Sequence, residues 1–126
     1  MCQALKRAGI GPEAIGYVNA HGTGTPNNDA SESAALRRIF GDNMPPVSST
    51  KAFTGHTTSA SGSIEAVFCL LALQHGFIPP QLNWKTPDPS CIVPCHSERS
   101  EESFSYILSN AFGFGGNDTS LIFSHL

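Results

Sequence analysis

The sequence predicts an α/β fold in which a mixed sheet packs against a buried central helix. Short apolar stretches typical of strands alternate with longer segments whose apolar residues recur at helical spacing. One helical segment, residues 59–76, is apolar on nearly every side, and a strand, glycine turn and strand close the chain. These three observations indicate one layered domain over residues 1–126.

The first third of the chain predicts the order helix, strand, helix. Residues 1–9 have the pattern of the end of a helix, and residues 16–20 form a short apolar stretch typical of a strand. We expect the second helix to begin at Asp29, where Glu32 three residues later completes a capping box. Gly41 is expected to end that helix.

A second strand is expected at residues 47–50, followed by the apolar helix over residues 59–76. Because this helix is apolar nearly all round, it needs cover on both sides, which is more than so short a chain easily builds. Glu65 lies within it, where an unpaired carboxylate is costly to bury. The expected partner of Glu65 is Lys51, from the preceding loop.

The last third predicts a loop and a hairpin. Residues 79–103 are rich in Pro, Ser and charged residues, and we expect an irregular surface loop over residues 88–103. The end of the chain, SYILSNAFGFGGNDTSLIFSHL, predicts two strands that reverse at residues 115–118.

Composition and charge exclude several classes of protein. The formal net charge is −3, and the seven Lys and Arg residues are scattered, so nucleic acid is not an expected partner. The longest apolar run, Ala66 to Leu73, is far below the ~18 residues that a membrane span needs. The first residues lack the apolar segment of a signal peptide. These features predict a soluble cytoplasmic protein that does not enter the membrane.

The four cysteines do not predict a disulfide framework. Cys91 and Cys95 with the adjacent His96 form a C-x3-C-H cluster that could bind zinc. A structural zinc site needs four ligands, and a second matching pair is absent. Loop thiols are the simpler interpretation, and no metal site is predicted.

Three polar or glycine-containing loops follow or join the expected strands: AHGTGTP, KAFTGH and NAFGFGG. Functional sites of α/β folds gather at the ends of strands, so these loops are the candidates for chemistry. They offer His21 and His56 as imidazoles, Lys51 as a cation and the backbone of residues 112–116 as amides open to close approach.

Simpler interpretations compete with each of these roles. A lone histidine is more often a surface or core residue than a functional one, although two in separate glycine loops favour function. The sequence GFGG fits a hairpin turn as well as a ligand site. A nucleotide site is excluded, because neither glycine cluster has the G-x-G-x-x-G spacing or opens a helix.

Three motifs in order resemble a known family: VNAHGTGTPNND, SSTKAFTGHTTSASG and SNAFGFGGND. They closely resemble the C-terminal half of the β-ketoacyl-acyl carrier protein synthases, the elongating condensing enzymes of fatty acid and polyketide synthesis. The resemblance runs from about Ala4 to Phe123, and only CIVPCHSERSEES departs from the family pattern. It implies the C-terminal half of a duplicated, thiolase-like layered fold.

The resemblance also implies roles for the four polar residues. Family members decarboxylate a malonyl thioester on acyl carrier protein and join the resulting carbanion to an acyl group held on a cysteine. Two imidazole N–H groups stabilise the enolate as it forms, and His21 and His56 match that pair. Lys51 matches the family's active-site lysine, and Glu65 matches the acidic residue behind it.

Further positions match substrate contacts of the family. Thr23 and Thr25 match hydroxyls that bind the amides of the pantetheine arm. Phe114 matches a gating aromatic whose backbone N–H helps to form the oxyanion hole for acyl transfer. Phe112 and Gly115 lie beside it and are expected to contact the substrate, because small residues let the backbone approach and move.

The implied reaction needs no resident cofactor, because the phosphopantetheine arrives on the carrier protein. The implied partners are acyl carrier protein, the N-terminal half that holds the nucleophilic cysteine or a partner chain that supplies it, and a second subunit in a homodimer. Since the four cysteines lack the expected context at the start of a buried helix, we expect the isolated chain not to catalyse condensation. Two alternatives stay open: a non-catalytic or truncated partner of a synthase, and a thiolase, which NAFGFGG disfavours because it lacks a cysteine.

Overall fold

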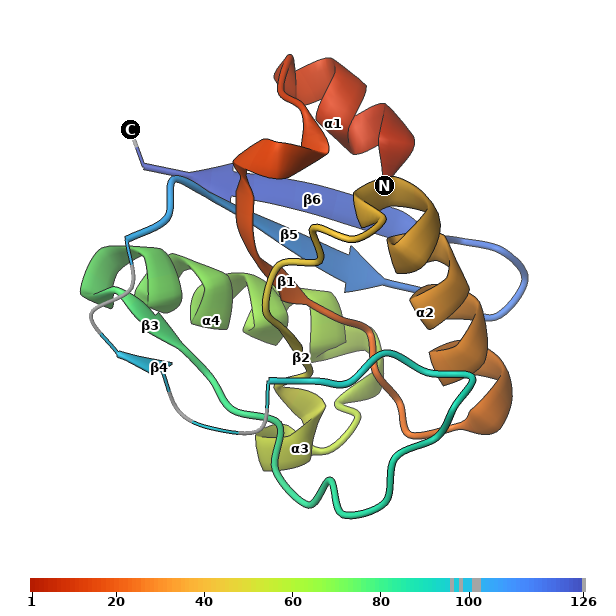
Figure 1. Ribbon diagram of the computed structural model, residues 1–126. Helices are drawn as coiled ribbons and strands as arrows, with labels where there is room; N and C mark the ends of the chain where they lie inside the picture. Colours follow the sequence, from red (N-terminus) through yellow and green to blue (C-terminus); the bar gives the residue numbers. More distant parts are fainter. Residues whose placement is uncertain (96, 98, 101–102, 126) are drawn as a thin grey trace.

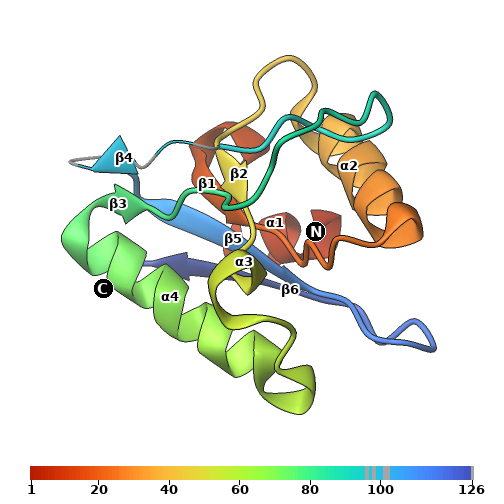
Figure 2. The ribbon, with the colours of Figure 1, turned by 90° about the horizontal axis from the view of Figure 1, so that it is seen from below.

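The computed structural model describes residues 1–125 except 96, 98, 101 and 102, and these form three layers (Figure 1). A central sheet separates helices α1 and α2 on one face from helix α4 on the other (Figure 2). The elements in order are α1 (Cys2–Ala8), η1 (Pro12–Ala14), β1 (Ile15–Asn19), α2 (Pro26–Phe40), β2 (Val47–Ser48), α3 (Lys51–Thr54), η2 (Thr58–Ala60), α4 (Ser61–His75), β3 (Phe77–Ile78), β4 (Arg99–Ser100), β5 (Tyr106–Ala111) and β6 (Thr119–Ser124).

The described strands of the main sheet lie in the order β2-β1-β5-β6. Strands β2 and β5 both run parallel to β1, whereas β6 pairs with β5 in the antiparallel direction. The sheet is therefore mixed, as the sequence predicts. The carboxyl ends of three parallel strands meet at one edge, which brings together the loops that follow β1, β2 and β5.

Each face of the sheet has its own apolar core. Leu36 and Phe40 of α2 pack with Val18 and Leu108 on one face. On the other face the core consists of Tyr17, Ile107 and Ile78 with Cys69, Ala72 and Leu73 of α4. Side chains alternate between the two faces along β1, so that Tyr17 and Val18 enter different cores. The sheet is covered on both faces, as expected for parallel strands.

The start of α2 differs from the expectation. The helix begins at Pro26 with Thr25 as its N-cap residue, three residues before Asp29. Proline suits a first helical position, since the N–H that it lacks would have no partner inside the helix. The capping box assigned to Glu32 is wrong: this side chain is buried and bonds to the loop after β1.

Helix α4 begins at Ser61, after a short 3-10 turn, and is covered on one side only by described residues. The buried side faces the sheet and includes Glu65, Cys69 and Leu73. On the opposite side Val67 is 56% exposed and Leu70 is 51% exposed. The expected cover on both sides is therefore not supplied by the described part of this chain.

Within the segment expected to be an irregular surface loop, Arg99–Ser100 forms β4, which pairs with β3 in the antiparallel direction. The glutamates of the motif SERSEES lie outside the described residues. The closing hairpin has the expected form, and Gly115 and Gly116 at its turn have φ values of 85° and 82°, a conformation that favours glycine. Across the part of the chain that is described, no helix is long and apolar enough to cross a membrane.

Candidate functional site

The candidate site lies at the edge of the sheet where the parallel strands end. His21 follows β1, Lys51 begins α3 directly after β2, and Phe112 follows β5. The rings of His21 and His56 lie 5.5 Å apart between centroids and are nearly perpendicular, at 87°. The ring of Phe112 lies 5.6 Å from that of His21. His56 and Phe112, which are 35 and 91 positions from His21 in sequence, thus both lie against its ring.

The loop that carries His21 is fixed by a buried carboxylate. The backbone N–H of His21 donates to Oε1 of Glu32, and that of Gly22 donates to Oε2, each over 3.0 Å. Asn110 of β5 donates its side-chain N–H to Oε1 of Glu32, also over 3.0 Å. One carboxylate therefore joins the His21 loop, α2 and β5. Burial raises the pKa of Glu32, and the three hydrogen bonds oppose that effect.

Gly22 is needed for the close approach of this loop to the next one. Its φ of 45° favours glycine, and a Cβ there would lie 2.5 Å from the Cβ of Ser49. Ser49 in turn donates its hydroxyl to the carbonyl of His21 over 3.4 Å. The glycine thus allows the loops after β1 and β2 to touch.

Lys51 and Glu65 form the buried ion pair that the sequence predicts. Their side chains are 5% and 3% exposed, and Ser61 donates a further hydrogen bond to Oε1 of Glu65 over 3.0 Å. Glu65 Oε2 has no hydrogen-bond partner among the described residues. Charges buried this deeply need good partners, and the pair supplies them from α3 and α4.

Lys51 also determines the protonation state of His21. Its ammonium group can only donate, so Nδ1 of His21, 3.3 Å away, accepts and the ring proton lies on Nε2. Burial, and then the charge of Lys51, lower the pKa of His21 from 6.5 to about 4. His21 is therefore a neutral imidazole at neutral pH, with Nε2 as its N–H donor.

His56 has the same tautomer for a different reason. The backbone N–H of Thr58 donates to Nδ1 of His56 over 3.1 Å, which leaves Nε2 to carry the proton. Thr58 has a φ of 51°, unusual for a residue other than glycine, and this turn aims the donated N–H at the ring. Unlike His21, His56 is exposed. Both imidazoles thus have Nε2 as their N–H donor, and the centroids of their rings lie 5.5 Å apart.

The two phenylalanines of NAFGFGG are placed differently. Phe112 is half-buried beside His21, whereas the side chain of Phe114 is fully exposed at the tip of the hairpin. Gly115 follows at an exposed position of the same turn. Of the two aromatic side chains, Phe112 is the one in contact with the cluster.

Thr23 and Thr25 lie on the loop between His21 and α2. Their hydroxyl groups are 2.9 Å apart and share a hydrogen bond. Thr23 is half-buried and Thr25 is exposed. A shared bond leaves hydroxyl capacity on both side chains for a further polar partner.

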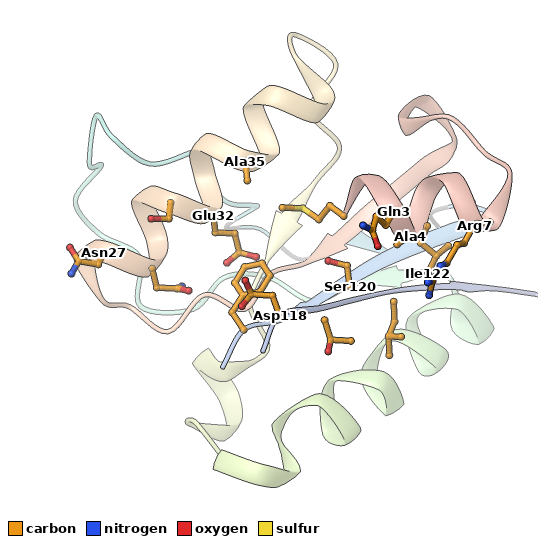
Figure 3. Close-up of a pocket in the computed structure, with 16 residues that line it drawn as sticks. Gln3, Ala4, Arg7, Asn27, Glu32, Ala35, Asp118, Ser120 and Ile122 are labelled. Atoms are coloured by element: carbon orange, nitrogen blue, oxygen red, sulfur yellow. The ribbon is translucent and has the colours of Figure 1, made fainter. Parts of the chain in front are cut away.

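An open groove of about 1160 Å³ lies between α1, α2 and β6 (Figure 3). Its walls come from α1, including Arg7, and from α2, including Asn27 and Glu32, with β6 as its floor. Phe112 lines the groove as well. The groove therefore connects the outer surface with the aromatic ring that touches His21.

Sequence reasoning missed Glu32 and Asn110 as residues of the site. A detectable signal was the position of Glu32 one helical turn after Asp29, but the same position also suits a capping box. Among the described residues, no group of three or more His, Cys, Asp or Glu side chains could hold a metal ion. His96 of the C-x3-C-H cluster lies outside that part of the chain.

Comparison with known proteins gives the family. Residues 1–85 match the family described as "Beta-ketoacyl synthase, C-terminal domain". The chain is 42% identical over 126 residues to 3-oxoacyl-[acyl-carrier-protein] synthase 1 of Escherichia coli, and the match covers 99% of the chain and 31% of that protein. It is 41% identical to 3-oxoacyl-[acyl-carrier-protein] synthase 2 of Coxiella burnetii, over 100% of the chain and 31% of that protein.

Solved structures agree with this assignment. The fold is similar to a β-ketoacyl synthase from Burkholderia phymatum, with a TM-score of 0.93, 41% identity and coverage of 100% of this chain and 31% of that one. It is also similar to a type II polyketide ketosynthase solved with its acyl-carrier protein, with a TM-score of 0.93, 31% identity and coverage of 99% and 31%. The fold is thus thiolase-like, and the chain spans about a third of the length of these relatives. The chain belongs to the β-ketoacyl synthase family and carries its C-terminal domain.

Proposed function

We propose that this chain supplies the decarboxylation site of a 3-oxoacyl-acyl carrier protein synthase. The observation that carries the proposal is the pair of imidazoles, His21 and His56, whose ring centroids lie 5.5 Å apart and which both have Nε2 as the donor. Loss of carbon dioxide from a malonyl thioester leaves the electron pair of the broken C–C bond on the thioester as an enolate. Two N–H donors aimed at its oxygen stabilise that charge as it develops.

The other residues keep the pair ready. Lys51 holds the His21 ring in the donor tautomer, and Glu65 compensates the buried charge of Lys51. Neutral donors suit this step, because an imidazolium would protonate the enolate before it could attack. The carbanion then attacks the carbonyl carbon of a cysteine-bound acyl thioester, and the cysteine leaves as a thiolate.

The acyl-accepting cysteine comes, in this proposal, from a part of the enzyme outside these 126 residues. Cys69 is buried in α4, and burial raises the pKa of its thiol to about 11, which disfavours the nucleophilic thiolate. Cys2 lies exposed on α1, and Cys91 and Cys95 lie in the segment after β3. The exposed apolar side of α4, with Val67 and Leu70, fits a contact with that remaining part.

The pantetheine arm of acyl carrier protein would approach His21 along the loop that follows it, and no resident cofactor is needed. Thr23 and Thr25 are placed on the loop after His21, where their hydroxyl groups would bind the amides of the arm. Phe112 would contact the substrate beside His21, and the hairpin tip with Phe114 and Gly115 would act as the gate. The backbone N–H of Phe114 would help to form the oxyanion hole for acyl transfer. A homodimer is the proposed assembly of the complete enzyme.

The test is a chimera in which this chain replaces the matching C-terminal region of the Escherichia coli relative. We expect the chimera to release carbon dioxide from malonyl-carrier protein and to form 3-oxoacyl product, whereas the chain alone forms none. His56→Ala should slow decarboxylation by about 10²–10³-fold, the cost of losing one oxyanion donor. Self-acylation of the cysteine should persist, and His125→Ala, at an exposed position after β6, is the matched control.

Two results would contradict the proposal. Equal loss of self-acylation and decarboxylation in His56→Ala would show that His56 maintains the fold or the acylation step. A folded chimera that acylates its cysteine but releases no carbon dioxide would favour the alternative of a non-catalytic partner chain.

A further inference from the structure

The outer edge of β2 is completed by a segment that is not a strand. Strand β2 lies at the edge of the main sheet, and the segment after β3 contacts its open side at two places, Pro79–Gln81 and Cys95. Cys95 donates its backbone N–H to the carbonyl of Val47 over 2.8 Å, and Ser48 donates its hydroxyl to the carbonyl of Pro79 over 2.6 Å. The segment thus satisfies polar groups that an edge strand otherwise exposes.

The next donor along this edge is satisfied by a side chain. The backbone N–H of Ser49 donates to Oε1 of Gln81 over 2.9 Å. Gln81 is itself anchored, because its backbone N–H donates to the carbonyl of Cys95 over 2.6 Å. Its carboxamide therefore takes the place that the carbonyl of a neighbouring strand would have.

Ser49 connects this contact to the candidate catalytic residues. Its hydroxyl donates to the carbonyl of His21 over 3.4 Å and accepts the backbone N–H of Lys51 over 3.4 Å. Ser49, which Gln81 holds, is thus hydrogen-bonded both to His21 and to Lys51, the residue that fixes the His21 tautomer. A shift of Ser49 would move Lys51 relative to the ring of His21.

Ser49 is buried, but a cavity borders it on one side. A cavity of about 380 Å³ lies between the His21 loop, α2 and the segment after β3, and its lining includes Gly22, Thr25, Ser49 and Gln81. Loops beside a cavity lack part of the van der Waals contact that fixes a packed core. Directional hydrogen bonds such as the one from Ser49 to Gln81 then determine where the backbone lies.

We infer that Gln81 is a positioning residue for His21 and Lys51. It acts on these two residues through its hydrogen bond to the backbone of Ser49. The inference rests on the proposed function for its meaning in catalysis. The contact and its effect on the two side chains are measurable in this chain without any turnover.

The test compares Gln81→Met, which keeps the length of the side chain and removes the acceptor, with Gln74→Met on the exposed side of α4. Amide hydrogen exchange at Ser49 should be about tenfold faster in Gln81→Met, the factor that corresponds to one ordinary hydrogen bond. Gln81→Glu keeps an acceptor, so exchange at Ser49 should stay slow. Gln74→Met should change nothing.

The second readout is the titration of the His21 ring, followed by NMR. Burial lowers the pKa of His21 most, Lys51 and then His56 lower it further, and Asp29 and Asp118 raise it. Gln81→Met changes none of these charges directly. If Lys51 moves away, the pKa of His21 should rise from about 4 toward 6.5.

Three outcomes would overturn the inference. Unchanged exchange at Ser49 in Gln81→Met would show that the bond does not hold this backbone. Faster exchange with an unchanged His21 titration would show that the contact does not position the pair. Equally accelerated exchange at core amides of β5 would show that Gln81 serves the stability of the whole fold. Failure of the proposed function would instead appear as missing decarboxylation, which none of these measurements uses.

Discussion

Removal of either partner of the Lys51–Glu65 pair should destabilise the fold far more than removal of both. The two side chains are 5% and 3% exposed, so each single variant leaves a charge buried without its partner. Breaking such a pair costs about 3–5 kcal/mol, whereas an apolar replacement of both partners is often neutral. We therefore expect Lys51→Met and Glu65→Leu to lose several kcal/mol each, and the double variant to be nearly as stable as the wild type.

The surroundings of each charge indicate which single variant is worse. In Lys51→Met the carboxylate of Glu65 keeps one described donor, the hydroxyl of Ser61, and its Oε2 has none. In Glu65→Leu the ammonium of Lys51 still donates to Nδ1 of His21. Lys51→Met should therefore lie near the upper end of the range, about 5 kcal/mol, and Glu65→Leu near the lower end, about 3 kcal/mol.

Urea denaturation followed by circular dichroism measures these changes as a double-mutant cycle. Lys85→Met and Glu13→Gln remove exposed charges of the same types and should stay within about 0.5 kcal/mol of the wild type. A loss below about 1 kcal/mol in Lys51→Met, or a coupling energy near zero, would refute the argument from burial. A neutral double variant would show that the pair is kept for its effect on His21 and not for stability.

Three further predictions concern the same site and the core beneath it. Because burial and Lys51 lower the pKa of His21 from 6.5 to about 4, its contribution to stability is full above pH 6.5 and is lost as pH falls toward 4. An NMR titration and unfolding at several pH values check this loss of about 3 kcal/mol, which His21→Gln should abolish. Gly22→Ala should cost more than Gly24→Ala in thermal denaturation: both have positive φ, but only the first would place a Cβ 2.5 Å from Ser49. Cys69, whose buried thiol has its pKa raised to about 11, should resist alkylation at pH 8 until the protein unfolds, and rapid labelling of the native chain would contradict its burial.

Most of the candidate site could be predicted from sequence because it follows a topological rule. Parallel strands end at one edge, so polar loops after β1, β2 and β5 had to meet there. The pairing of Lys51 with Glu65 followed from the cost of burying a lone carboxylate in an apolar helix. These inferences use the positions of the strands and the cost of burial, which the apolar pattern of the sequence indicates well.

The role of Glu32 could not be predicted in the same way. Its partners are backbone groups of His21 and Gly22 and the side chain of Asn110, which is 78 positions away in sequence. The local capping pattern suggested a competing role, and the tertiary contacts prevailed because three donors converge on one buried carboxylate. The start of α2 at Pro26 was missed for a related reason, since the apolar stripe of the helix begins only further along.

The exposed side of α4 shows a second limit. Its apolar residues predicted a helix covered on both sides. The helix is present, yet its residues Val67 and Leu70 are exposed among the described residues. A hydrophobic pattern indicates that a surface needs cover and does not indicate which chain supplies it.

The two candidate donors are held in different ways, and this difference bears on how the proposed site would work. His21 is buried, and its backbone, its Nδ1 and its ring each have a fixed partner in Glu32, Lys51 and Phe112. His56 is exposed, and its ring contacts the backbone N–H of Thr58 and the ring of His21. A hydrogen-bond donor stabilises a developing charge strongly only where water is excluded, because the Coulomb energy falls as the dielectric constant rises. In the proposed function, decarboxylation therefore requires that the side of the site next to His56 be covered by the bound pantetheine arm or the rest of the enzyme. On this argument, an external thiol added to the chain would not by itself restore condensation, since the open site lacks both the acyl acceptor and the dry surroundings of its second donor.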